Sequence, residues 1–310
     1  MTSSAAVVRA AVLGSPIRHS KSPQLHTAAY RFLGLDCRYT RIDLTESEAG
    51  AFLSAEAAEH TGFSVTMPLK TVMVQQMTST SDRVSTLGTL NTITVENTPS
   101  GQLQLRGENT DVDGITAALT EAGLSMQASA ETAAAGHFAV IGGGGTASAA
   151  LAAAAELGFR TARVYVRSPD RAAALAPVAQ QLGLHAEIRR LDQLPADLTT
   201  DETAAVVSTL PPHAADLLAT ALPPLVRRVP LLDVAYDPWP SALASSWQTA
   251  GGTVISGLQM LLHQAVKQVE LFTAATCRPA AQLDSADRTA MLGRMRAAVG
   301  MNTPEWPSSA

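Results

Sequence analysis

The chain has 310 residues, 46% of them hydrophobic, and a formal net charge of -5 at pH 7. This length and hydrophobic content suffice for two domains, each with its own core, and we expect a cleft between them. The acidic balance, without a long Lys/Arg block, argues against nucleic acid or anionic lipid as the main partner. Only Cys37 and Cys277 are present, and none of the seven histidines has metal-ligand spacing to another, so we expect a reducing compartment and no metal site.

Two segments bear on export and membrane insertion. Residues 1–10 lack a basic region followed by an apolar stretch of signal-peptide length, so we expect no export. Residues 133–155 carry no formal charge, but they are rich in alanine and are interrupted by four glycines at 142–145. Such a break suits a turn better than a lipid-facing helix, so we expect a soluble cytoplasmic protein.

The first third of the chain alternates strand and helix patterns, which predicts a small open α/β sheet. The expected strands are 8–13, 38–44 and 63–66, the expected helices are 23–33, 46–58 and 69–77, and a hairpin is expected from 91–96 with 102–106.

A linker helix over 112–122 and a Ser/Ala/Thr-rich loop up to 135 precede a second alternating series. Strands are expected at 137–141, 162–166, 204–208 and 230–235 with helices between them, and a long helix over 258–273 closes the chain. This order implies parallel strands with right-handed crossovers. We therefore predict an α/β protein of two domains, an open sheet domain (1–111 with 257–300) and a doubly wound, Rossmann-like nucleotide domain (112–256), followed by a flexible tail (301–310).

A glycine turn follows the strand expected at 137–141. It comprises Gly142, Gly143, Gly144 and Gly145, with Thr146 opening an alanine-rich helix. In this strand–turn–helix order, glycines let the backbone approach a pyrophosphate, and the helix N-terminus supplies unpaired N–H groups. The pattern favours a dinucleotide site over a merely flexible loop.

The end of the next strand bears on which dinucleotide is bound. Arg167, Ser168 and Arg171 stand where an NAD site would place an acidic residue, and they could hold a 2′-phosphate through charge-assisted hydrogen bonds. This favours NADP. Asp170 could instead serve a ribose, and both arginines could be ordinary surface cations, so those alternatives stay open.

The loop Gly14–Pro23 is dense in hydroxyls, and Ser20 and Ser22 can point two of them the same way at the start of a helix. We expect this loop to bind a carboxylate group of the ligand. Ser22 before Pro23 would equally serve as an N-cap with proline at the first helical position, a role that needs no ligand.

Lys70 and Asp111 are the candidate proton-transfer groups. We expect Lys70 at the start of a helix, where the dipole and burial would lower its pKa, with Ser64, Thr66 and Asn91 as polar neighbours. A solvated surface lysine is the alternative. Asp111 ends the run Asn109–Asp111, which would also cap a helix.

From Val12 to about Val269 the chain resembles the shikimate dehydrogenase family. The motifs occur in the family's order: Gly14–Pro23 (GSPIRHSKSP), Ser64–Lys70 (SVTMPLK), Leu87–Thr92 (LGTLNT), Asn109–Asp111 (NTD), the glycine turn, Arg167–Arg171 (RSPDR) and Gly257–Gln264 (GLQMLLHQ). The resemblance implies reduction of 3-dehydroshikimate to shikimate with NADPH, a step of chorismate and aromatic amino acid biosynthesis, by a lysine and aspartate pair.

The resemblance also implies residue roles. Lys70 would be the catalytic acid/base with Asp111, and Ser20, Ser22 and Thr66 would contact the carboxylate side of the substrate. Asn91, Asp111 and Gln264 would contact its ring hydroxyls, with Tyr236 nearby. Gly257 and Met260 would line the nicotinamide side, and Thr209 would lie beside the cofactor.

Two departures from the family pattern stand out: Ser64 replaces a frequent asparagine, and Ser148 replaces a frequent arginine after the glycine turn. The first would weaken a hydrogen bond around Thr66 or Lys70, and the second removes a cation near the cofactor phosphates. The alternatives are a quinate/shikimate or aminoshikimate dehydrogenase with a broader substrate range or use of NAD, and a non-catalytic shikimate or NADPH sensor. The oligomeric state is left open, a homodimer included.

Overall fold

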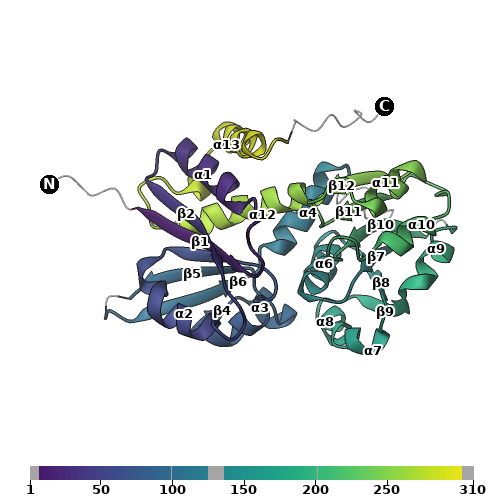
Figure 1. Ribbon diagram of the computed structural model, residues 1–310, viewed down its shortest axis with the longest axis horizontal. Helices are drawn as coiled ribbons and strands as arrows, with labels where there is room; N and C mark the ends of the chain where they lie inside the picture. Colours follow the sequence, from purple (N-terminus) through teal and green to yellow (C-terminus); the bar gives the residue numbers. More distant parts are fainter. Residues whose placement is uncertain (1–6, 99, 125–135, 201, 302–310) are drawn as a thin grey trace. The chain divides into compact units, whose positions relative to one another are not determined.

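The computed structural model describes residues 7–98, 100–124, 136–200 and 202–301. The chain divides into two compact units, the first comprising Met1–Thr110 with Gln264–Ala310 and the second Asp111–His263 (Figure 1). Nearly all of the expected tail, and most of the loop expected up to residue 135, lie outside the described residues.

The first unit is built on a six-stranded mixed sheet of order β2-β1-β3-β5-β6-β4. β1 is parallel to both β2 and β3, whereas β5 is antiparallel to β3 and β6. The expected open sheet and hairpin are thus confirmed. The strands are β1 (Val8–Gly14), β2 (Cys37–Asp43), β3 (Gly62–Val65), β4 (Ser79–Thr80), β5 (Thr92–Asn97) and β6 (Leu103–Glu108).

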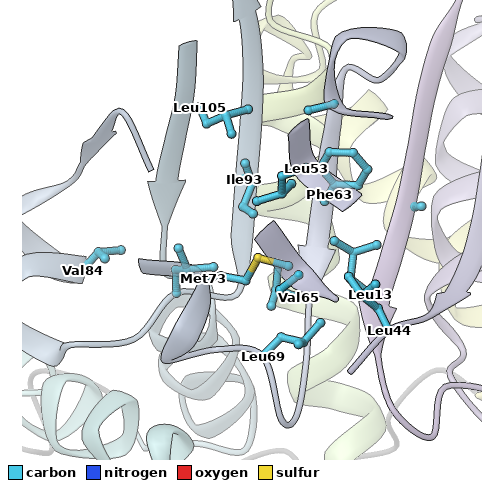
Figure 2. Close-up of a cluster of buried hydrophobic side chains, with 14 residues drawn as sticks. Leu13, Leu44, Leu53, Phe63, Val65, Leu69, Met73, Val84, Ile93 and Leu105 are labelled. Atoms are coloured by element: carbon cyan, nitrogen blue, oxygen red, sulfur yellow. The ribbon is translucent and has the colours of Figure 1, made fainter. Parts of the chain in front are cut away.

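Alternating side chains on β3 separate the two faces of this sheet. Phe63 and Val65 enter an apolar core with Leu53 and Met73, as Figure 2 shows. Phe63 is fully buried, a contribution of about 1.5–3 kcal/mol. The elements that supply this core beside the sheet are α2 (Ala49–Glu56), η1 (Ala57–Glu59), η2 (Val72–Gln76) and α3 (Asp82–Leu87).

The other face of the sheet carries helices from both ends of the chain. A Cβ atom at Gly62 would collide with the Phe272 ring, which shows how closely α12 packs on β3. His26 of α1 stacks on Tyr39 of β2 with ring centroids 4.0 Å apart. The remaining helical elements of the first unit are α1 (Ser22–Leu33), α12 (Gly257–Phe272, which begins in the second unit), η4 (Ala280–Gln282) and α13 (Ser285–Ala298).

The helix expected over residues 69–77 is wrong. Residues 67–71 form turns, and only the five-residue 3-10 helix η2 follows. Thr71, Val72 and Val74 are β-branched and disfavour an α-helix. Lys70 therefore lies in a turn, and the helix-dipole argument made for it does not hold.

The second unit is a six-stranded sheet of order β12-β11-β10-β7-β8-β9 in which every pairing is parallel. The strand order reverses between β7 and β10, which is the switch point of a doubly wound sheet. The Rossmann-like prediction is confirmed, with β9 and β12 as additional edge strands. The strands are β7 (His137–Ile141), β8 (Thr161–Val166), β9 (His185–Arg190), β10 (Thr203–Ser208), β11 (Pro230–Asp233) and β12 (Thr253–Ser256).

Helical segments precede β7 and connect the strands of this sheet. They are α4 (Asp111–Glu121), α6 (Gly145–Glu156), α7 (Pro169–Ala172), α8 (Leu175–Gln181), η3 (Leu191–Gln193), α9 (Leu194–Asp197), α10 (Asp216–Thr220) and α11 (Ala242–Thr249). Trp247 of α11 is fully buried and donates its indole N–H to the carbonyl of Val229 at 2.9 Å. The alanine-rich α6 is buried within its unit, and no helix in the described ranges has the length and apolarity needed to cross a membrane.

Candidate active site

The loop after β1 and the loop after β3 are joined by backbone contacts. Ser15 N–H donates to the carbonyl of Met67 at 3.1 Å, and Thr66 N–H donates to that of Leu13 at 2.9 Å. A side chain at Gly14 would collide with Thr66. Because β1 and β3 are adjacent and parallel, the polar runs that follow them share the carboxyl edge of the sheet.

Arg41 holds the loop Gly14–Pro23 in place. Its Nε and Nη2 atoms donate to the Ser20 carbonyl at 3.0 and 2.6 Å. Ser22 N–H donates to Ser20 Oγ at 3.3 Å, so the two serines are adjacent. The N-cap alternative for Ser22 is wrong: α1 begins at Ser22, and its N-cap is Lys21 without a side-chain cap. A buried serine hydroxyl at the helix start is thus not committed to capping.

A backbone hydrogen bond to Leu90 holds Lys70 close to Asn91. The Lys70 carbonyl accepts a hydrogen bond from Leu90 N–H at 2.9 Å, and its side chain is half-buried in the turn after Pro68. The same turn contains the exposed Met67 and the buried Leu69. The backbone of Lys70 is thus anchored next to the start of β5.

Asn91 is the centre of the polar cluster in the first unit. Its Oδ1 accepts from Thr110 N–H at 2.7 Å and from the Thr92 hydroxyl at 2.8 Å. Its Nδ2 donates to Thr110 Oγ1 at 3.0 Å and to Gln264 Oε1 at 3.2 Å. Asp111, the residue after Thr110 in the chain, is the first residue of α4 rather than its cap, and it is 1% exposed.

Ser64, the first departure from the family pattern, does not act where expected. Its hydroxyl donates to Gln268 Oε1 at 2.7 Å and accepts from Tyr39 at 2.6 Å, on the face of the sheet covered by α12. Burial raises the pKa of Tyr39, and hydrogen bonds with Ser64 and Ser22 partly oppose that shift. The sequence analysis missed Gln268, although it follows Gln264 by one helical turn, a spacing that puts both on one face.

The glycine turn in the second unit has the conformation that a close backbone approach requires. Gly142 has φ of +112°, a region that favours glycine, and a Cβ atom there would collide with Thr209 Oγ1. A side chain at Gly143 would come within 3.2 Å of Val166 and Ala172. Gly144 faces open space and is the N-cap of α6, which has no side-chain cap. Thr209 Oγ1 donates to the carbonyl of Ile141 at 3.0 Å.

Arg167, Ser168 and Arg171 follow β8, the strand adjacent to β7, and all three are exposed. Neither arginine makes an ion pair with any residue that the structure describes. Asp170 lies in the first turn of α7. Ser148, the second departure, donates its hydroxyl to the carbonyl of Gly145 at 2.8 Å and is buried, so it presents no group in place of an arginine.

Tyr236, Gly257 and Met260 also belong to the second unit. The loop that holds half-buried Tyr236 is fixed by Asp233, whose carboxylate accepts from the Ser241 hydroxyl at 2.6 Å. Burial raises the pKa of Asp233, opposed by its hydrogen bonds. A side chain at Gly257 would collide with the backbone of residue 234, and Met260 is buried.

The candidate residues thus form two groups. Ser20, Ser22, Thr66, Lys70, Asn91 and Gln264 lie in the first unit, and Asp111, the glycine turn, the arginines, Thr209, Tyr236, Gly257 and Met260 lie in the second. A doubly wound sheet with a glycine turn at its switch point, joined to a unit rich in hydroxyls, amides and a lysine, defines a two-domain, dinucleotide-dependent oxidoreductase.

Comparison with known proteins gives the family. Residues 12–93 match the model of the shikimate dehydrogenase substrate binding domain. A shikimate dehydrogenase (NADP(+)) from Methylobacterium radiotolerans is 32% identical over 268 residues, covering 86% of this chain and 92% of that protein. The chain belongs to the shikimate dehydrogenase family.

Solved structures agree with this assignment. The shikimate dehydrogenase of Mycobacterium tuberculosis is 39% identical, with a TM-score of 0.74 over 92% of this chain and 99% of that one. A shikimate 5-dehydrogenase from Thermus thermophilus, in complex with NADP(H) and shikimate, is 26% identical, with a TM-score of 0.72 over 94% and 99% of the two chains.

Proposed function

We infer that this enzyme catalyses the reversible NADPH-dependent reduction of 3-dehydroshikimate to shikimate. Its relatives are named NADP-dependent shikimate dehydrogenases, and the Thermus relative was solved with both molecules. We assign the substrate to the first unit and the cofactor to the second. When bound, NADPH supplies the hydride that reduces the ketone.

The second unit fits NADP(H) by its shape and charge. Gly142 adopts a backbone conformation that favours glycine, and Gly144 leaves open space where a pyrophosphate would approach the start of α6. Arg167 and Arg171 would hold the 2′-phosphate, with Ser168 as a further donor, because guanidinium groups bind phosphate through paired charge-assisted hydrogen bonds. Asp170, the group that would favour NAD, lies in α7 between these two cations.

The first unit suits a small acid with several hydroxyls. Ser20, Ser22 and Thr66 would bind the carboxylate, and Asn91 and Gln264 would bind the ring oxygens together with Asp111, the first residue of the second unit. Hydroxyl and amide groups of this kind position a polyol by hydrogen bonds that an apolar analogue leaves unmade.

Lys70 and Asp111 are proposed as the acid–base pair. Lys70 would donate a proton to the oxygen of the ketone as it becomes an alkoxide and take it back in the oxidation of shikimate. One observation carries this assignment: Leu90 bonds to the Lys70 carbonyl, and its neighbour Asn91 bonds to Thr110, the residue before Asp111. Lys70, the substrate-binding amide and the chain leading to Asp111 are thus linked by two hydrogen bonds.

The test is the oxidation of shikimate, quinate and aminoshikimate with NADP+ and NAD+, followed by the absorbance of the reduced cofactor. We expect the largest kcat/KM for shikimate with NADP+. A larger value for quinate with NAD+ would instead identify a quinate dehydrogenase. Binding of shikimate without turnover of any substrate would identify a sensor.

A further inference from the structure

Buried polar side chains lie behind the substrate-binding residues of the first unit. They are His26 of α1, Tyr39 of β2, Ser64 of β3 and Gln268 of α12, and none is more than 8% exposed. All are linked through the amide of Gln268 or through Ser64. Because polar groups buried this deeply need hydrogen-bond partners, the direction of each bond can be worked out.

The backbone carbonyl of Asn91 fixes the orientation of Gln268. The Gln268 amide nitrogen lies 3.2 Å from this oxygen. A carbonyl has no proton to give, so only the NH2 end of the amide can face it. The second hydrogen of that NH2 group donates to Thr92 Oγ1 at 2.9 Å. Gln268 Oε1 therefore points the other way.

The groups that face Gln268 Oε1 must both donate. The Ser64 hydroxyl does so at 2.7 Å and the Nε2 atom of His26 at 3.2 Å. Ser64 has then used its proton, so Tyr39 donates to Ser64; His26 carries its proton on Nε2, so its Nδ1 accepts from Tyr30 at 3.0 Å. Burial lowers the pKa of His26 to about 3, with the Gln268 bond opposing the shift, so the ring is neutral at neutral pH.

The same reasoning continues toward the substrate-binding residues. Thr92, which accepts from Gln268, donates its own proton to Asn91 Oδ1 at 2.8 Å, and Thr110 N–H donates to the same atom at 2.7 Å. These two bonds hold the Asn91 side-chain oxygen toward Thr92 and Thr110. Asn91 Nδ2 donates to Gln264 Oε1 at 3.2 Å. The amide of Gln264 is left with its NH2 end to offer to a ligand.

We propose that Gln268 is a positioning residue that sets the hydrogen-bond polarity of the substrate-binding amides, so that Gln264 presents its NH2 group as a donor to a substrate oxygen. Gln268 acts through Thr92 and Asn91 and does not itself touch the substrate. The proposal rests on the proposed function in that the ligand it serves is shikimate.

The kinetic test compares Gln268→Met with Thr273→Val, a matched loss of a buried polar group. Thr273 lies just beyond α12, is fully buried and accepts from Ala280 N–H at 2.9 Å. We expect Gln268→Met to raise the KM for shikimate about tenfold, the effect of losing one oriented hydrogen bond, while the KM for NADP+ is unchanged. Thr273→Val should lower thermal stability without this change in KM. Equal KM values for the two variants would overturn the proposal.

A double-mutant cycle separates positioning from a general loss of structure. Because Gln268 acts through the amide of Gln264, Gln268→Met should change the KM for shikimate little when it is added to Gln264→Ala. The same tenfold increase in both backgrounds would contradict this path.

The third readout needs no substrate. Nitrogen NMR of the histidine rings, with His26 assigned by comparison with His26→Gln, should show the proton of His26 on Nε2. A proton on Nδ1 would reverse the deduced bonds and overturn the proposal. If the wild-type protein oxidised no shikimate, the proposed function would fail, while this spectrum would still decide the orientation of Gln268.

Discussion

Lys70 is the residue on which the proposed proton transfer depends. Lys70→Ala should lower kcat by about 10²–10⁴-fold, the usual contribution of a positioned acid or base, with a smaller change in KM. The measurement is steady-state turnover of 3-dehydroshikimate with NADPH. Lys267→Ala is the control, because that lysine is exposed on α12 and pairs with Glu270. Unchanged turnover in Lys70→Ala would remove the lysine from the mechanism.

Arg167 tests the choice of cofactor at the same scale. Its exposed guanidinium would bind the 2′-phosphate of NADPH, a group that NADH lacks. Arg167→Ala should therefore raise the KM for NADPH about tenfold or more and leave the KM for NADH nearly unchanged. Arg160→Ala, at the opposite end of β8 and also exposed, should alter neither KM. An equal increase in the KM for both cofactors in Arg167→Ala would contradict binding of the 2′-phosphate by Arg167.

The turn between β7 and α6 gives a prediction at the scale of an element. Gly142 and Gly158 both have positive φ, +112° and +91°, but only a Cβ atom at Gly142 would meet another group, Thr209. Alanine at Gly158 should destabilise the fold by about 1–2 kcal/mol, measured by urea unfolding, and alanine at Gly142 by more, because its Cβ atom would also collide with Thr209. Only Gly142→Ala should also raise the KM for NADPH. A similar KM in both variants would show that the turn is not part of the cofactor site.

Elements with strong local patterns could be predicted from the sequence. The strand 137–141 with its glycine turn and helix corresponds to β7 and α6, and the apolar residues of 8–13 correspond to β1. β9 was missed because its burial alternates only weakly and it carries Arg189 and Arg190, as edge strands often do. α13 was missed because few of its residues are buried.

The candidate site also has residues that could be predicted from the sequence and residues that could not. Runs such as Ser64–Lys70 could be found because their residues are close in sequence. The bonds among His26, Ser64 and Gln268 could not, because the longest of them join residues 242 and 204 positions apart. Pairings of this range depend on tertiary packing, so the sequence contains no local signal for them.

At the scale of the whole molecule, each unit contains a buried neutral histidine. Burial lowers the pKa of His26 to about 3, and burial and then Arg163 lower that of His137 to about 4. Below about pH 6.5 the unfolded chain binds protons that the folded chain does not, so stability falls as pH falls toward these values, by about 1.4 kcal/mol per pH unit for each histidine. Above pH 6.5 neither histidine contributes to the pH dependence.

His137→Gln should therefore reduce the loss of stability between pH 7 and pH 5 by about 2 kcal/mol. The measurement is urea unfolding followed by tryptophan fluorescence, since Trp247 is buried in the same unit. His185→Gln, an exposed position in that unit, is the control and should keep the wild-type pH dependence. If His137→Gln also kept it, His137 would not be the group that titrates.

The most direct measurement for the whole account is the oxidation of NADPH and of NADH by the purified protein in the presence of 3-dehydroshikimate. We expect rapid turnover with NADPH, a much lower kcat/KM with NADH, and shikimate as the product. Shikimate binding without turnover by either cofactor, or turnover that prefers NADH, would contradict the central claim that this chain is an NADPH-dependent shikimate dehydrogenase.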